Sequence, residues 1–195
     1  MMETLLSILI CSVENEERKK SLQKLIYELQ HQINKNYAEE LVEIIIDTDN
    51  MIKSVGKKRN DLIEKAKGKY VCFIDDDDFI SDNYLNVILN HLNFDYDIVL
   101  IAISQILDGN ITKTIIPSLY IDNVVSNNSI FKTNHFHLCP HKKSIAKLVL
   151  FDCINFSEDM IYSQKIVQYI TNYFLVEEPL YLYFDNIQKS LTRNV

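Results

Sequence analysis

The chain has 195 residues, of which 47% are hydrophobic and 24% are charged, and this balance excludes a disordered protein. Its formal net charge of −7 argues against a nucleic-acid backbone as the main partner. No segment approaches the ~18 continuous apolar residues of a membrane span, and no cleavage site follows the apolar residues 4–13. The cysteines are widely spaced and form no C-x-x-C pair, which indicates free thiols in a reducing compartment. We therefore expect a soluble, cytoplasmic protein without a transmembrane segment.

The first half of the chain alternates predicted strands and helices. Apolar runs predict buried strands at residues 5–11, 41–46, 70–74 and 98–103. Leu and Ile at three- and four-residue spacing predict helices between them, at residues 16–36, 56–67 and 82–92. This alternation predicts a parallel sheet flanked by helices.

The second half is less regular. The dipeptide Asp108-Gly109 is a hairpin signal that leads to a predicted strand at 111–116, so we expect an antiparallel extension of the sheet. The polar, Asn- and Ser-rich residues 117–134 predict a surface excursion. Helices are then predicted at 142–149 and 159–170, followed by strand-like runs at 173–176 and 180–184.

Acidic side chains stand at the carboxyl ends of two predicted strands. Asp47 and Asp49 follow the second strand, and the run Asp75–Asp78 follows the third. Ligands of open α/β sheets bind beyond these strand ends, and carboxylates suit Mg²⁺ or Mn²⁺ together with substrate phosphates. A metal and diphosphate site is one interpretation. A solvated acidic turn that caps the next helix is the other, and the acids alone do not decide between them.

Cations gather at the start of the predicted helix 56–67, where Lys57, Lys58 and Arg59 follow Gly56. Cations at this end oppose the helix macrodipole, and a bound diphosphate would explain them. Three histidines lie within residues 135–141, but their spacing matches no zinc motif. A histidine that lines a substrate pocket fits the pattern better than a dedicated zinc site.

Four segments match, in order, the motifs of one known family. Residues 7–11 (Ser-Ile-Leu-Ile-Cys) and 43–47 (Glu-Ile-Ile-Ile-Asp) resemble its first two strands. Residues 56–60 (Gly-Lys-Lys-Arg-Asn) resemble its G-x-x-R-N helix, and Asp75–Asp78 its Asp-x-Asp metal motif. Residues 157–159 (Ser-Glu-Asp) resemble its acceptor-side Glu-Asp motif. With these motifs the chain resembles the inverting glycosyltransferases of family 2, which have the GT-A fold.

This resemblance implies a fold and an activity. The fold would be a Rossmann-like α/β mixed sheet with central parallel strands flanked by helices, in a single domain over residues 1–195. Residues 1–105 would bind the nucleotide-sugar, and residues 106–195 the acceptor. The enzyme would be a metal-dependent inverting glycosyltransferase that moves a sugar from a nucleotide-sugar, a UDP-sugar by family frequency, to a hydroxyl of a glycan, a lipid-linked acceptor or a protein. A lipid-linked acceptor would bring the protein to a membrane surface.

The resemblance also implies roles for residues of this chain. Asp77 and Asp75 would hold Mn²⁺ or Mg²⁺, which neutralises the charge growing on the departing diphosphate. Asp159 would take the proton of the acceptor hydroxyl, and Glu158 would orient the acceptor. The nucleotide-sugar would be contacted by Ser12, Glu14, Asp47, Asp49, Lys58, Arg59, Asp75 and Asp76.

Some features depart from the family pattern. Ser12 and Glu14 stand where many members have Thr or Pro-rich residues, and Asp47 and Asp49 compete for the contact with the nucleotide base. A sugar nucleotidyltransferase is an alternative, but it would need a Gly-rich basic loop, which residues 12–18 do not supply. A degenerate member that binds nucleotide-sugar without turnover is another alternative, and the intact acidic motifs argue against it.

Overall fold

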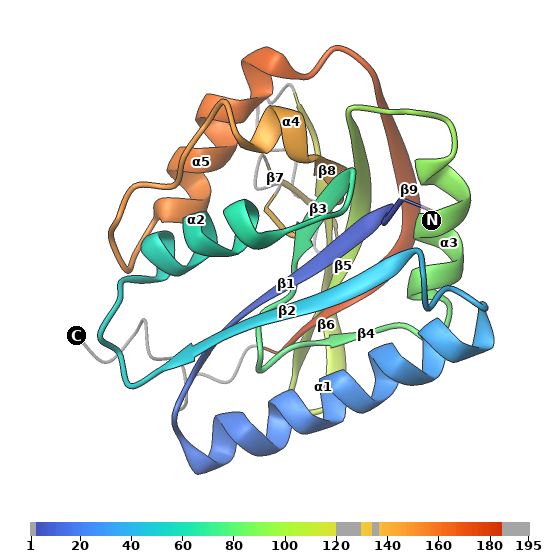
Figure 1. The fold of residues 1–195 in the computed structure, drawn as a ribbon. Helices are drawn as coiled ribbons and strands as arrows, with labels where there is room; N and C mark the ends of the chain where they lie inside the picture. Colours follow the sequence, from blue (N-terminus) through green and yellow to red (C-terminus); the bar gives the residue numbers. More distant parts are fainter. Residues whose placement is uncertain (1–2, 120–129, 134–136, 185–195) are drawn as a thin grey trace.

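The computed structural model describes residues 3–119, 130–133 and 137–184. A mixed β-sheet forms its centre, with strands in the order β2-β1-β3-β8-β5-β6-β7, while β9 pairs with β5 and β4 with β9 (Figure 1). The strands are β1 Leu6–Val13, β2 Val42–Asp49, β3 Tyr70–Phe73, β4 Phe79–Ile80, β5 Ile98–Leu107, β6 Asn110–Pro117, β7 Ile130–Thr133, β8 His141–Lys142 and β9 Tyr173–Phe184.

The first three strands of the sheet form one of its parallel parts, and β9 on β5 and β7 on β6 also pair in parallel. β1 pairs in parallel with β2 on one side and with β3 on the other. Its residues Leu6, Ile8, Leu9 and Ile10 are fully buried, as a continuous apolar run predicts for a central parallel strand. The short strand β8 then pairs antiparallel with both β3 and β5, and β5 turns through the predicted Asp108-Gly109 hairpin into β6. The predicted mixed α/β sheet with central parallel strands is therefore confirmed.

Helices cover this sheet in two groups (Figure 1). The helices are α1 Glu16–Lys35, α2 Val55–Lys65, α3 Tyr84–Leu92, α4 Lys143–Ala146 and α5 Glu158–Ile166, with a 3₁₀ turn at Val167–Tyr169. α2 packs on β1 and β2 and touches α5, whereas α1 contacts α3 and β1. The side chain of Asn15 caps α1 by accepting the backbone N–H groups of Glu17 and Arg18, and Ser54 caps α2. α1 thus begins at Glu16, shortly after β1 ends at Val13, and α2 begins at Val55 after the loop that follows β2.

β2 continues three residues beyond its predicted end. Backbone pairing with β1 extends to the pair Val13 and Asp49, so Asp47 and Asp49 belong to the strand. The sequence pattern gave an end at residue 46 because the apolar run stops there, whereas the ladder is set by the partner strand. Successive side chains of a strand point to opposite faces of the sheet, so Asp47 and Asp49, which are two residues apart, lie on the same face.

Other differences lie in the second half of the chain. The two predicted strand-like runs are one strand, β9, because register shifts opposite Ile101 and Ala102 absorb the residues between them. The predicted helix 142–149 covers only 143–146, and the helix predicted to reach 170 becomes a 3₁₀ turn after Ile166. Of the predicted surface excursion, residues 120–129 and 134 lie outside the described residues, and residues 130–133 form β7, which pairs with β6. Within the described ranges, no helix has the length and apolar character that crossing a membrane requires.

Candidate active site

The four carboxylates of the Asp75–Asp78 turn point in different directions. Asp78 is buried and accepts the Tyr181 hydroxyl at 2.8 Å and the Phe184 backbone N–H at 2.9 Å, so it ties the turn to β9. Burial, followed by the neighbouring charges of Asp75 and Asp77, raises its pKa. Asp75 and Asp77 keep 38% of their side-chain surface exposed. The turn therefore presents the two ends of the Asp-x-Asp motif to a ligand.

Asp76 is buried against the end of β1. The Ser12 hydroxyl donates to its Oδ2 at 2.6 Å, and a guanidinium nitrogen of Arg18 lies 3.0 Å from its Oδ1. Burial raises the pKa of Asp76 to about 6, although Arg18 and the Ser12 hydroxyl both lower it. The other terminal nitrogen of Arg18 forms an ion pair with Asp77. Arg18 was not among the predicted site residues. A cation in the first turn of a helix, the signal used for α2, could have found it.

Arg59 connects the acids of the two halves of the chain. Its Nη2 lies 3.5 Å from Asp75 Oδ1 and 3.5 Å from Glu158 Oε1. The guanidinium is buried and lies 5.1 Å from the ring centre of Phe73 and 5.3 Å from that of Phe151. Its Nε and Nη1 have no hydrogen-bond partner among the described residues. Arg59 thus has two N–H-bearing nitrogens beside both acidic motifs that make no hydrogen bond to the described residues.

Lys58 connects the ends of β1 and β2. Its ammonium donates to the Ser12 carbonyl at 2.6 Å and pairs with the Asp49 carboxylate. Asp49 also accepts the backbone N–H groups of Met51 at 3.1 Å and Lys53 at 2.8 Å. These bonds occupy both oxygens of Asp49. Desolvation raises the pKa of Asp49, but hydrogen bonds from Lys58 and the backbone together outweigh it and lower the pKa. Lys58 and Asp49 are therefore committed to the strand ends.

Asp47 has a smaller set of contacts. Its Oδ2 accepts the Lys53 ammonium at 2.7 Å, and its side chain is 7% exposed. Glu14 lies opposite the same strand end, where its backbone N–H donates to the Asp49 carbonyl at 3.0 Å and its side chain is exposed. Asp47 and Glu14 thus both lie at the β1–β2 edge beside Ser12.

Glu158 and Asp159 form the first turn of α5. The preceding residue, Ser157, has a φ of 61°, a left-handed conformation that turns the chain sharply into the helix. Glu158 is buried, which raises its pKa, while Arg59 lowers it. Asp159 is 29% exposed, and its Oδ2 lies 3.8 Å from Nδ1 of the buried His137. The acids therefore differ: Glu158 faces Arg59, and Asp159 faces His137 and solvent.

The other histidines occupy different places. His141 is fully buried in β8, where the Tyr162 hydroxyl lies 2.7 Å from Nε2 and the Cys139 carbonyl 2.8 Å from Nδ1. The carbonyl requires a proton on Nδ1, so Nε2 accepts from the tyrosine. Burial lowers the pKa of His141 to about 4. His141 is thus a core residue, His137 lies at the site, and His135 lies outside the described residues.

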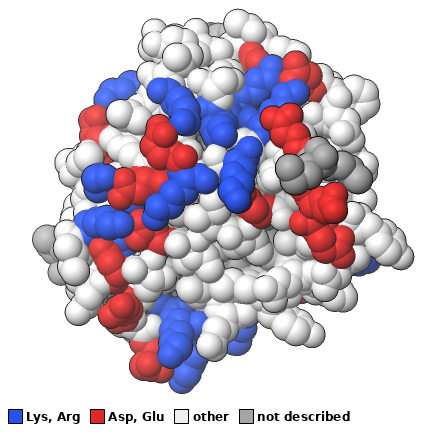
Figure 2. Space-filling view, viewed as in Figure 1, with Lys and Arg blue, Asp and Glu red and all other residues white. Residues whose placement is uncertain are grey.

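The carboxylates allow a limited kind of metal binding. In the part of the chain that the structure describes, no group of three or more His, Cys, Asp or Glu residues could hold a metal ion. A Mg²⁺-type ion needs only one or two protein carboxylates when substrate phosphates and water complete its shell. The half-exposed carboxylates of Asp75 and Asp77 fit that donor set. Charged groups of both signs also intermingle on the face seen in Figure 2, so this face has no broad basic patch.

The mixed sheet with acids at its carboxyl edge defines a Rossmann-like α/β protein with a ligand site at the strand ends. Over residues 30–150 the sequence matches the family model for glycosyl transferase family 2. The chain therefore belongs to the family 2 glycosyltransferases, and the family expected from the motifs is confirmed. No curated protein matches this chain.

Solved structures support the same fold. The chain is similar to S. aureus TarS 1–349, with 16% identity and a TM-score of 0.65 over 93% of this chain and 60% of that one. It is equally similar to TarS 1–349 in complex with UDP-GlcNAc (16% identity, TM-score 0.65, 93% and 58% covered). For the complex with UDP, the identity is 17% and the TM-score is 0.65, with 93% of this chain and 60% of that one covered. The chain thus spans about 60% of these structures, and the likeness confirms the expected GT-A fold.

Proposed function

We propose that this chain transfers a sugar from a nucleotide-sugar to an acceptor hydroxyl, with inversion at the anomeric carbon. The observation that carries the proposal is the position of Arg59, whose buried guanidinium lies between Asp75 at the end of β3 and Glu158 at the start of α5. These acids come from segments more than 80 residues apart, and each belongs to a motif with a different task. Residues 1–105 supply the donor side of this site, and residues 106–195 supply the acceptor side.

A UDP-sugar is the proposed donor, since TarS, the similar structure, is known in complex with UDP-GlcNAc and with UDP. Asp47 is the better candidate for the contact with the base, because Asp49 already accepts hydrogen bonds on both oxygens. Ser12 supports the donor side by holding Asp76, and Lys58 does so by holding Asp49 and Ser12. The exposed carboxylate of Glu14 stands at the edge of the same site.

Asp75 and Asp77 are proposed to hold Mn²⁺ or Mg²⁺ with the donor diphosphate. Bound there, the ion supplies positive charge to the diphosphate as it leaves. Arg59 holds a permanent positive charge beside Asp75, because its buried guanidinium lies 3.5 Å away and cannot lose its proton. The Nε and Nη1 of Arg59, which have no partner among residues 3–119, 130–133 and 137–184, offer further donors to an anionic ligand.

Asp159 is proposed as the base. It takes the proton of the acceptor hydroxyl as the acceptor oxygen bonds to the anomeric carbon, while the bond from that carbon to the diphosphate oxygen breaks and its electron pair leaves with the nucleotide. His137, 3.8 Å away, faces the carboxylate that receives this proton. Glu158, held by Arg59, orients the acceptor. The acceptor classes that fit this chemistry are a glycan, a lipid-linked acceptor and a protein hydroxyl.

Calorimetry with UDP and Mn²⁺ tests the donor side. Asp77→Ala should weaken Mn²⁺-dependent binding of UDP at least tenfold, about 1.4 kcal/mol, since a carboxylate ligand is lost. Asp82→Ala removes an exposed carboxylate outside the Asp-x-Asp turn and should bind as the wild type does. Absence of UDP binding to the wild type, or wild-type binding by Asp77→Ala, would contradict the proposal.

Asp159→Asn tests the acceptor side. The variant should bind UDP and Mn²⁺ normally and lose about 10²–10⁴-fold of sugar transfer, because it lacks the base but keeps the size of the side chain. Donor consumption is measured with a panel of UDP-sugars and hydroxyl acceptors. Unchanged transfer by Asp159→Asn would remove this residue from the mechanism.

A further inference from the structure

Arg18 lies where a divalent cation would meet the Asp-x-Asp turn. One terminal nitrogen is 3.0 Å from Asp76 Oδ1, and the other forms an ion pair with Asp77. Its side chain is 22% exposed, so the guanidinium sits at the mouth of the site with Asp76 beneath it. The residue belongs to the first turn of α1, which follows β1 directly. The positive charge of Arg18 therefore lies against Asp77, a residue that is proposed to bind the metal ion.

The start of a helix favours negative charge beside a cation such as Arg18. A cation in the first turn of a helix is disfavoured by the macrodipole, and the other charged residues at the start of α1 are Glu16 and Glu17. The carboxylates of Asp76 and Asp77 supply further negative charge beside its guanidinium. A donor diphosphate would supply it equally well, because helix N-termini and guanidinium groups both favour phosphate.

A metal ion and Arg18 compete for the same carboxylate. Both are cations, and repulsion between them disfavours simultaneous close contact with Asp77. The Nε of Arg18 has no hydrogen-bond partner in the described part of the chain, so one donor is unused in the present position. A guanidinium that turns from Asp77 to a phosphate group could use this donor as well as its terminal nitrogens.

We propose that Arg18 is a diphosphate-binding residue that exchanges partners: it neutralises Asp77 in the unliganded protein and moves to the donor diphosphate when a divalent cation takes Asp77. This inference rests on the proposed function. Its consequence is that Asp77 binds the ion alone weakly and binds it well together with the nucleotide. The site then selects the metal–nucleotide complex over the free ion, and Arg18 contributes to the coupling between the two ligands.

Calorimetry on Arg18→Gln tests the exchange, with Mn²⁺ alone and with UDP in the presence of Mn²⁺. Mn²⁺ alone should bind to Arg18→Gln at least about fivefold more tightly than to the wild type, because Asp77 has lost its partner. UDP with Mn²⁺ should bind about tenfold more weakly, because a charge-assisted contact to phosphate is lost. Lys19→Gln is the matched control: it makes the same charge change on the next residue, which is exposed, and both affinities should stay at their wild-type values.

Both shifts must occur for the exchange to hold. If Mn²⁺ binding is unchanged, or UDP binding is unchanged, the exchange is wrong even though the wild type binds UDP with Mn²⁺. If the wild type binds neither UDP nor Mn²⁺, the proposed function itself fails. Thermal unfolding confirms that each variant is folded. If Arg18→Gln does not fold, Arg18→Lys replaces it, and smaller shifts in the same two directions are expected since one ammonium cannot bridge two carboxylates as the fork does.

Discussion

Replacing Arg59 with Met removes the guanidinium that lies between Asp75 and Glu158. Breaking a buried ion pair from one side typically costs about 3–5 kcal/mol, because the other charge stays buried. Here the contacts to both carboxylates are 3.5 Å long and Asp75 is 38% exposed, which places the expected loss near the lower limit, at about 3 kcal/mol. Glu158, with 6% of its side chain exposed, carries most of this cost.

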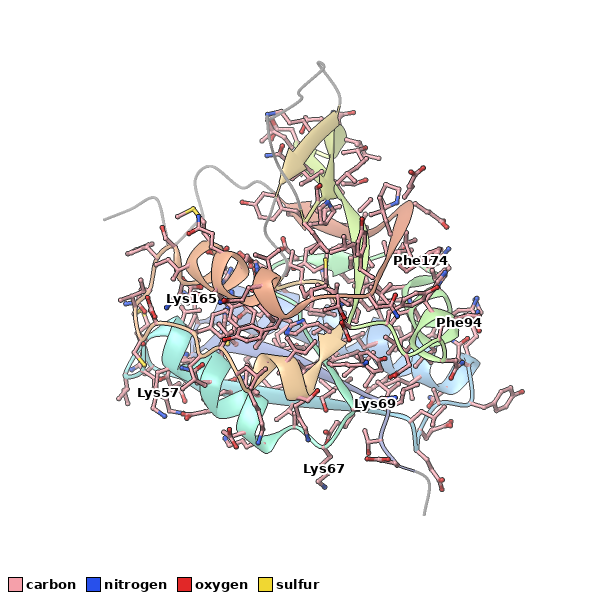
Figure 3. All side chains as sticks on the ribbon, turned by 90° about the horizontal axis from the view of Figure 1, so that it is seen from above. Lys57, Lys67, Lys69, Phe94, Lys165 and Phe174 are labelled. Atoms are coloured by element: carbon pink, nitrogen blue, oxygen red, sulfur yellow. The ribbon has the colours of Figure 1, made fainter. Side chains whose placement is uncertain are left out.

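Urea unfolding at pH 7 measures the loss. Adding Glu158→Gln to Arg59→Met should return about 1 kcal/mol or more, because the buried charge is gone. The contacts of the guanidinium with Phe73 and Phe151 are not returned. Lys57→Met is the control. Lys57 points away from α2 in Figure 3, pairs with Asp61 at the surface, and should change stability by less than about 0.5 kcal/mol.

The same variant has a defined pH dependence. Without Arg59 the pKa of Glu158 rises further above its value in the unfolded chain, so the native state binds more protons than the unfolded state. Stability of Arg59→Met relative to the wild type should therefore recover as the pH falls through this raised pKa. A loss below about 1 kcal/mol at pH 7, or an additional loss on adding Glu158→Gln, would refute the reasoning.

Two further changes test the packing around the site. Gly56→Ala places a Cβ 1.9 Å from the Asp152 carbonyl oxygen, so urea unfolding should show a loss of about 1–3 kcal/mol, and a gain from better helix propensity would contradict this. His141→Gln tests the neutral imidazole: its pKa is lowered from 6.5 to about 4, so the wild type gives up about 3 kcal/mol as the pH falls from 6.5 to 4. In the variant, the free energy of unfolding should lack this decrease with falling pH. An equal decrease in both proteins would show that His141 is not its cause.

The sequence predicted the elements that local patterns define. The apolar runs of β1 and β3 and the periodic helices α1 and α2 are confirmed, because burial on one face or on both leaves a local signature. Asp75–Asp78 follow β3 as predicted, whereas Asp47 and Asp49 form part of the end of β2. Pairings between distant segments leave no such signature. The prediction was therefore wrong on the length of β2 and on the division of β9 into two runs, because pairing with partner strands determines both.

The site shows the same division. Its acids were named from sequence motifs, but their partners come from other elements. Arg18 reaches the Asp-x-Asp turn from α1, and His137 reaches Asp159 from a turn beside β3, whose Phe73 N–H donates to the His137 carbonyl. Neither contact follows from spacing. The expectation that a histidine lines the pocket could not choose among three histidines, because only the folded chain brings His137 to Asp159 and His141 to Tyr162.

Asn60 joins α2 to the segment that precedes α5. Its amide donates to the Phe151 carbonyl at 2.9 Å and accepts the Phe151 backbone N–H at 2.9 Å. Both bonds are made to main-chain atoms, which every amino acid at position 151 other than proline would provide. Gly56 likewise donates its N–H to the Ile154 carbonyl. Exposed side chains of this segment, such as those of Ile154 and Phe156, can therefore be exchanged during evolution while the attachment to α2 persists.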